Sequence, residues 1–176
     1  MTFGNPKDFA IEAYHEPSGS EWGGYGRLCI HIEGARLGNI RDNHCSLFHV
    51  ADRFRALPSI IETLWGEAFV GVSDAEVFGL IDRAQSWEPF DFLTNTGEMF
   101  NGTKTFIVCR PDGRVQILYW LRNDTFGSGS CSTQSFRIVA AAFVSWFDEQ
   151  VRTTAPPFFP INPFDLNEKV PDNQDA

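Results

Sequence analysis

Residues 104–122 read KTFIVCRPDGRVQILYWLR, and this stretch predicts a β-hairpin. Two runs rich in β-branched and aromatic residues flank Pro111-Asp112-Gly113, a tripeptide that favours a tight turn. The second run is apolar on both faces around Ile117–Leu121, which is typical of a central strand. The hairpin therefore indicates an antiparallel sheet at the centre of the fold.

Two more strands are predicted nearer the N-terminus. Phe9–Tyr14 is bounded on both sides by turn-forming residues, and in Arg27–Glu33 apolar residues alternate with others in the period of a half-buried strand. Gly34–Gly38 then predicts a turn. The glycine-rich stretch at 23–26 precedes a strand and opens no helix, so it indicates a turn or bulge rather than a phosphate-binding loop.

Helices are predicted between and after these strands. Ser73 and Glu76 form a capping box in front of a helix over Asp74–Gln85. Thr133–Arg152 carries one apolar stripe at helical spacing and predicts the longest helix, capped by Ser132 or Thr133.

Three segments are less regular. Cys45–Val50 suits either a short strand or the start of a helix, and Asp52–Trp65 predicts a helix interrupted at Pro58, with a new helix from Ser59. The Gly- and Ser-rich stretch 125–132 predicts a flexible loop.

The order of these elements predicts an α+β fold: an antiparallel sheet with helices packed mainly on one face, a long C-terminal helix and a Pro-rich C-terminal arm. We expect residues 1–160 to form a single domain, because no linker divides them. Residues 161–176 are predicted to be an acidic, disordered tail.

Charge and composition narrow the classes of partner. The 176-residue chain has a net charge of −9 and only three lysines, with no basic run, so nucleic acid is not expected as a partner. An acidic surface attracts a basic protein instead.

No apolar run approaches the roughly 18–20 residues of a membrane span. The N-terminus lacks the pattern of a signal peptide, and four cysteines without a C-x-x-C motif are typical of free thiols, so we expect a cytoplasmic protein.

The sequence contains no strong motif for metal binding or catalysis. His31, His44, Cys45 and His49 are close in sequence, but their spacing does not place four ligands on one face, so no metal site and no cofactor are expected. The sequence has no nucleophile elbow, protease signature or H-E-x-x-H motif, and no catalytic residue is predicted. Glu12 and Glu33 could lie on neighbouring strands, although such pairs arise by chance among 23 acids.

Aromatic residues beside carboxylates suggest a surface for a protein partner. Tryptophan and tyrosine are enriched at the centres of protein interfaces, and acids beside them suit a basic partner. Packing of the same aromatic rings into the core is the alternative. The candidate contacts are Glu21, Trp22, Tyr25, Trp87, Glu88 and Asp91.

The opening Phe3-Gly-Asn-Pro-Lys-Asp-Phe-Ala-Ile11 resembles the start of the immunity protein 42 family. These are bacterial immunity proteins encoded beside polymorphic toxins, including those of contact-dependent growth inhibition systems. In that family a turn like Gly4-Asn5-Pro6 leads into a strand beginning Phe-Ala-Ile, and an acidic loop with a tryptophan follows. The resemblance spans roughly residues 1–40 and implies a non-enzymatic protein that binds a toxin domain and occludes it.

Three functions remain open at this point. The resemblance and the charge favour an immunity protein whose toxin is basic, with a nuclease suggested by family habit. An acidic adaptor domain that binds through its tail is the first alternative. A small intracellular hydrolase with an unrecognised site is the second.

Overall fold

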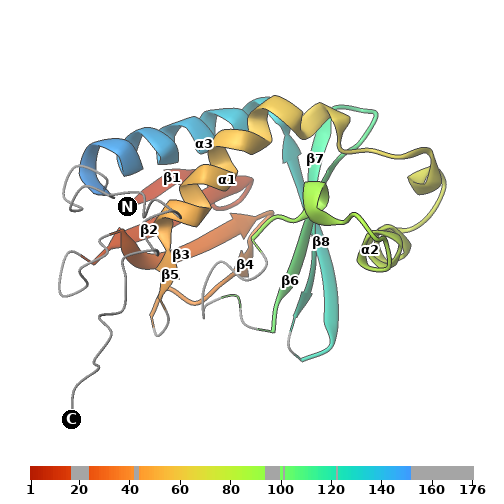
Figure 1. Ribbon diagram of the computed structural model, residues 1–176, viewed down its shortest axis with the longest axis horizontal. Coiled ribbons are helices and arrows are strands. Elements are labelled where there is room, and N and C mark those ends of the chain that lie inside the picture. Colours follow the sequence, from red (N-terminus) through yellow and green to blue (C-terminus); the bar gives the residue numbers. More distant parts are fainter. Residues whose placement is uncertain (17–23, 42–43, 94–99, 101, 122, 152–176) are drawn as a thin grey trace, which may run out of the picture.

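The computed structural model describes residues 1–16, 24–41, 44–93, 100, 102–121 and 123–151. Within them the chain forms two antiparallel sheets and three α-helices (Figure 1). The predicted Pro-rich arm, the domain boundary at 160 and the acidic tail lie outside the described residues.

The first sheet confirms the two predicted N-terminal strands. It contains β1 (Thr2–Gly4), β2 (Phe9–His15), β3 (Tyr25–Ile32), β4 (Ala35–Leu37) and β5 (Cys45–Ser46), with β3 at its centre. The predicted turn over Gly34–Gly38 is wrong in part, because β4 occupies most of it. The turn itself is Glu33-Gly34, whose φ angles of 48° and 81° suit a two-residue hairpin connection.

The second sheet confirms the predicted hairpin and adds a strand that was expected to be a loop. Its order is β6 (Lys104–Cys109), β7 (Arg114–Leu121) and β8 (Thr125–Ser132). The small residues of β8 reflect close packing rather than flexibility. A Cβ on Gly129 would lie 2.7 Å from Cγ1 of Ile32, and one on Gly127 would collide with the Tyr119 ring.

The helices are α1 (Leu47–Ile60), α2 (Asp74–Asp82) and α3 (Thr133–Trp146), and a π-helical segment, Phe147–Val151, continues α3. The capping box is present, and α2 ends three residues before the predicted end. The side chain of Ser132 accepts a hydrogen bond from the Ser135 backbone N–H and so caps α3.

Helix α1 corrects the expected break at Pro58. The chain forms β5 at Cys45–Ser46, enters α1 at Leu47, and stays helical through Pro58 to Ile60. Pro58 lies in the last turn and lacks the N–H that would donate to the carbonyl four residues earlier, so other contacts must hold this turn helical. Leu57 and Ile61 are fully buried on either side, and this burial holds the last turn in place.

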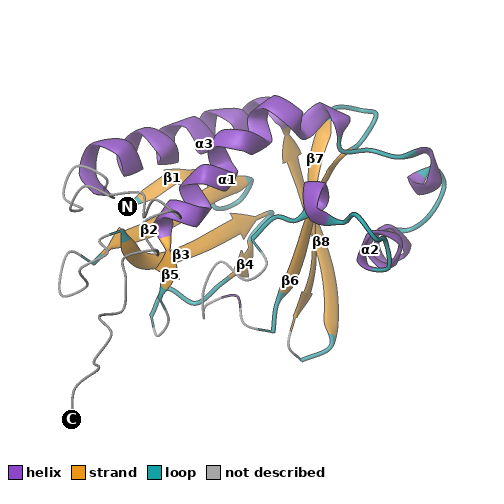
Figure 2. Ribbon diagram, in the orientation of Figure 1, coloured by secondary structure: helices purple, strands orange, loops and turns teal. Residues whose placement is uncertain are grey.

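The helices are divided between the two sheets, which corrects the expected single sheet. Helices α1 and α3 pack together on one face of the first sheet, and α2 lies on the far side of the second sheet (Figure 2). No helix of the described residues lies on the opposite face of the first sheet (Figure 1).

One large apolar core joins α1 and α3 to both sheets. The second sheet contributes Ile107 and Ile117 to it, whereas their neighbours Phe106 and Leu118 point outward into a smaller cluster with Phe78 of α2. The two faces of the second sheet are therefore both buried, one in each cluster.

The four cysteines are buried and free, as the sequence predicts. Burial raises the pKa of the Cys45 and Cys131 thiols to about 12. The thiolate is the reactive form of cysteine, so these two side chains are protected against alkylation in the folded protein.

We expect Gly129→Ala to lower the free energy of unfolding by about 1–3 kcal/mol, because the added methyl group overpacks the contact with Ile32. Urea unfolding measures the change. Gly66→Ala is the matched control, since its Cβ would meet nothing closer than 3.7 Å, and it should be neutral or stabilising by up to about 1 kcal/mol. Equal losses in the two variants would contradict the packing explanation.

A second prediction concerns thiol chemistry. At about pH 9, where an exposed thiol is largely ionised, Cys45 and Cys131 should resist a thiol-specific reagent in the native protein. A raised pKa keeps the thiol neutral over a wider pH range, so labelling should begin only as the pH nears 12 or the chain unfolds. Mass spectrometry of labelled peptides, with denatured protein as the control, measures this. Native labelling at the denatured rate would refute it.

Candidate partner-binding surface

The structure describes four of the six candidate contacts, and these four lie in two places. Glu21 and Trp22 lie outside the described residues. Tyr25 begins β3 in the first sheet and is 44% exposed. The other three lie together on and beside the 3-10 turn Glu88–Phe90, next to β6 of the second sheet.

Helix α1 holds this 3-10 turn in place through Arg53. Its Nη2 donates to the carbonyl oxygen of Pro89 (2.8 Å) and to that of Asp91. Asp91 also forms a β-bridge with Phe106, and the Trp87 ring packs edge-on against the same phenylalanine, at 6.3 Å between centroids. Trp87 and Asp91 are therefore half-buried anchors, and Glu88 projects into solvent.

The surrounding segment, residues 66–91, carries much of the negative charge of the chain. It has six acids and one base, Arg83, so its net charge is −5 of the total −9. The acids are Glu67, Asp74, Glu76, Asp82, Glu88 and Asp91. We call this stretch the acidic segment. Most of this segment was not predicted as a partner contact, because that prediction considered only acids beside aromatic residues. A running charge count along the sequence indicates the whole segment.

A polar network fixes the first turn of α2, and with it the acidic segment, on the second sheet. The carboxylate of Asp74 accepts hydrogen bonds from Arg110, from Gln116 and from Ser128 Oγ (2.7 Å). Gln116 is only 7% exposed, so its amide depends on these partners. At the same turn, hydrogen bonds from Ser73 lower the pKa of Glu76 and favour its charged form.

A hollow of about 660 Å³ lies between α2 and the strands β6 and β7. Phe78 and Phe100 supply apolar walls, Trp120 at its edge is 36% exposed, and an ion pair joins Lys104 to Asp82. An exposed tryptophan beside an apolar hollow with charged groups around it is typical of a protein-binding hot spot.

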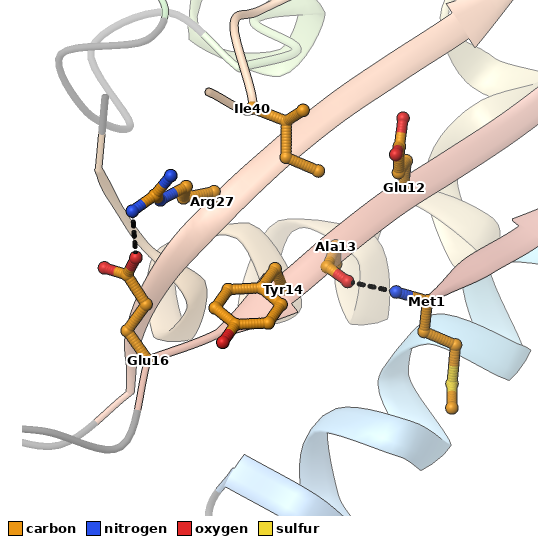
Figure 3. Close-up of a pocket in the computed structure, with 7 residues that line it drawn as sticks. All are labelled: Met1, Glu12, Ala13, Tyr14, Glu16, Arg27 and Ile40. Carbon is orange, nitrogen blue, oxygen red and sulfur yellow. Dashed lines mark hydrogen bonds and ion pairs between the residues drawn. The ribbon is translucent and has the colours of Figure 1, made fainter. Parts of the chain in front are cut away.

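A second hollow, of about 490 Å³, lies on the bare face of the first sheet (Figure 3). Tyr14, 55% exposed, lines it together with Glu16 and Arg27, which form an ion pair of 2.5 Å. His44 also contacts Glu16, at 2.6 Å. The charges here are nearly balanced.

The structure gives His44, Cys45 and His49, which are close in sequence, separate surroundings. His44 pairs with Glu16, Cys45 is buried and His49 lies on α1. Among the described residues, one group brings three ligand-type atoms within 4.8 Å of one another: Glu12, Cys29 and His31. Of this group, His31 was considered from the sequence as a metal ligand and Glu12 only as part of a carboxylate pair, because the group depends on the register of β2 with β3.

Glu12 and Glu33, which the sequence analysis considered as a carboxylate pair, do not form one. Glu12 contacts His31 Nε2 at 3.1 Å. Glu33 lies in the turn after β3, where it accepts a hydrogen bond from Ser130 Oγ (3.2 Å). The two acids thus have separate partners on separate parts of the molecule.

Comparison with protein families gives a match over most of the chain. The model described as Immunity protein 42 (Imm42) matches residues 1–146, which extend from β1 to the last residue of α3. The chain belongs to the Imm42 family. Comparison with curated proteins and comparison with solved structures find no match.

As an Imm42 protein the chain is not an enzyme, and it has a cognate toxin as its partner. The resemblance seen in its first residues is thereby confirmed over most of the chain. Both hollows and the whole acidic segment fall within the matched residues. Of the described helices, none is long and apolar enough to cross a membrane.

We expect Asp74→Ala in this Imm42 protein to lower the free energy of unfolding by about 1–3 kcal/mol, because it removes the acceptor of Arg110 Nη2 and of the buried amide nitrogen of Gln116. Asp82→Ala, which removes only the half-exposed ion pair with Lys104, should cost less than about 1 kcal/mol. Urea unfolding of both variants measures the difference. Similar costs would mean that the network does not hold α2.

Proposed function

We propose that this protein neutralises its toxin by one-to-one binding, with the acidic segment 66–91 as its main contact. The observation that carries the proposal is the net charge of −5 on a segment whose acids are mostly exposed beside a tryptophan-edged hollow. A field of one sign accelerates the encounter with a partner of the opposite sign, and apolar anchors then slow its dissociation.

The toxin that such a surface fits is basic. Enzymes that cleave nucleic acids carry clusters of Lys and Arg that neutralise phosphates, so an acidic inhibitor complements them. We therefore infer that the toxin is a nuclease and that binding occludes its active site or a surface next to it. Four free, buried cysteines suit a reducing compartment, which supports action in the cytoplasm.

Calorimetry with the toxin domain encoded beside this chain tests the function itself. We expect one-to-one binding with a dissociation constant in the nanomolar range, and loss of toxin activity on nucleic acid at equal molar amounts. Absence of binding to a correctly folded toxin domain would overturn the proposal. Tight binding to a toxin without nuclease activity would overturn only the inferred toxin class.

Charge reversal tests the surface. Glu67→Lys with Glu88→Lys should weaken toxin binding at least about tenfold, mostly through slower association, and should reduce its salt dependence. Both side chains are exposed, so folding should persist. Asp52→Lys with Glu62→Lys is the matched control: it makes the same change in net charge on side chains that are 71% and 65% exposed elsewhere. Equal weakening by both pairs would show that net charge acts without a local contact.

Truncation after Pro160 separates this proposal from an adaptor that binds through its tail. Residues 161–176 carry four acids and one lysine, and they fall outside the family match. The truncated chain should keep its toxin affinity within about threefold, which is less than 1 kcal/mol. Loss of binding on truncation would favour the tail as the contact.

A further inference from the structure

We propose that Glu12, Cys29 and His31 form a binding site for a divalent transition-metal ion, with Zn²⁺ as the ion that fits best. The site lies on the bare face of the first sheet, apart from the acidic segment. It is independent of the function proposed above.

The register of two strands creates the site. Glu12 of β2 is the direct cross-strand partner of Cys29 in β3. His31 lies two residues after Cys29, so it projects from the same face of the strand. Two neighbouring strands thus supply three different ligand types on one face of the sheet, and the ligand atoms lie within 4.8 Å of one another.

The ligand set matches the chemistry of zinc. Zn²⁺ takes cysteine sulfur at about 2.3 Å and histidine nitrogen or carboxylate oxygen at about 2.0–2.2 Å. Tetrahedral coordination at these lengths requires ligand atoms roughly 3.3–3.7 Å apart. Glu12 and His31 are already 3.1 Å apart, so small side-chain rotations are enough to admit an ion. Three protein ligands leave the fourth position open for water.

The surroundings provide both support and access. Burial raises the pKa of the Cys29 thiol, and the hydrogen bond that Nε of Arg36 donates to its Sγ at 3.0 Å acts in the opposite direction. This contact can persist as an outer-shell hydrogen bond to a metal-bound sulfur. The Cys29 residue is fully buried, whereas the side chains of His31 and Glu12 are 16% and 34% exposed. Glu12 also lines the hollow of Figure 3, through which an ion can enter from solvent.

Metal titration of the full, reduced and chelator-treated chain tests the site. Calorimetry with Zn²⁺ should give one ion per chain, and Co²⁺ should give an absorption band from sulfur-to-metal charge transfer. Cys29→Ser should abolish that band, and His31→Asn or Glu12→Gln should weaken Zn²⁺ binding by more than about tenfold. Zn²⁺ should also raise the melting temperature of the unmodified chain, because a ligand of the native state stabilises it.

Two variants serve as controls. His44→Asn removes a histidine near the same sheet face, and Cys109→Ser removes a buried thiol elsewhere; both should leave the band and the affinity unchanged. Glu12→Gln preserves the shape of the side chain, so weaker Zn²⁺ binding by this variant would not result from loss of folding. The proposal is overturned if reduced, folded protein binds no Zn²⁺ at micromolar concentration. It is equally overturned if the three ligand variants bind Zn²⁺ as tightly as the two controls.

Discussion

Both sheets turn one face into the same apolar core, and this shared packing decides which surfaces remain for a partner. The contact is close: Ile32 of β3 occupies space beside Gly129 of β8 that a side chain would fill. Phe54 of α1 and Phe143 of α3 then complete the core, with their ring centroids 5.5 Å apart. The other face of the first sheet carries no helix among the described residues, while the second sheet needs α2 to cover its outer apolar residues.

This division separates two kinds of surface. On the bare face of the first sheet, polar side chains satisfy one another across strands, as Glu12 and His31 do. On the far side of the second sheet, apolar packing secures one side of α2, Asp74 bonds to the sheet, and Glu76 is exposed to solvent. More than half of the net charge of the sequence therefore lies in a segment that packs outside the main core.

Local patterns predicted the elements well, and long-range packing explains the exceptions. The hairpin around Pro111-Asp112-Gly113, the capping box and the stripe of α3 depend on near neighbours, and all are present. The segment 125–132 was predicted to be a loop because it is rich in glycine and serine. Its glycines are in fact required by contacts with residues far away in sequence, such as Ile32, and a local pattern does not show such contacts. The division into two sheets has the same origin, since no local signal shows which strand faces which helix.

The candidate site was predictable only in part. Trp87, Glu88 and Asp91 do lie together, because they are neighbours in sequence around a single 3-10 turn. Tyr25 lies in the other sheet, a separation that sequence distance alone does not reveal. The group of Glu12, Cys29 and His31 requires knowledge of strand register, and the sequence fixes register only after the pairing partner is known.

The attachment of α2 has a consequence for how this protein diversifies. Its buried side, Val77, Phe78 and Ile81, belongs to a cluster separate from the main core, and Asp74 fixes its first turn. Substitutions on its outward side therefore leave the fold intact, since no core contact depends on them. Under the toxin contact proposed above, a lineage could therefore follow changes in its cognate toxin by substitutions on this helix while inheriting the same scaffold.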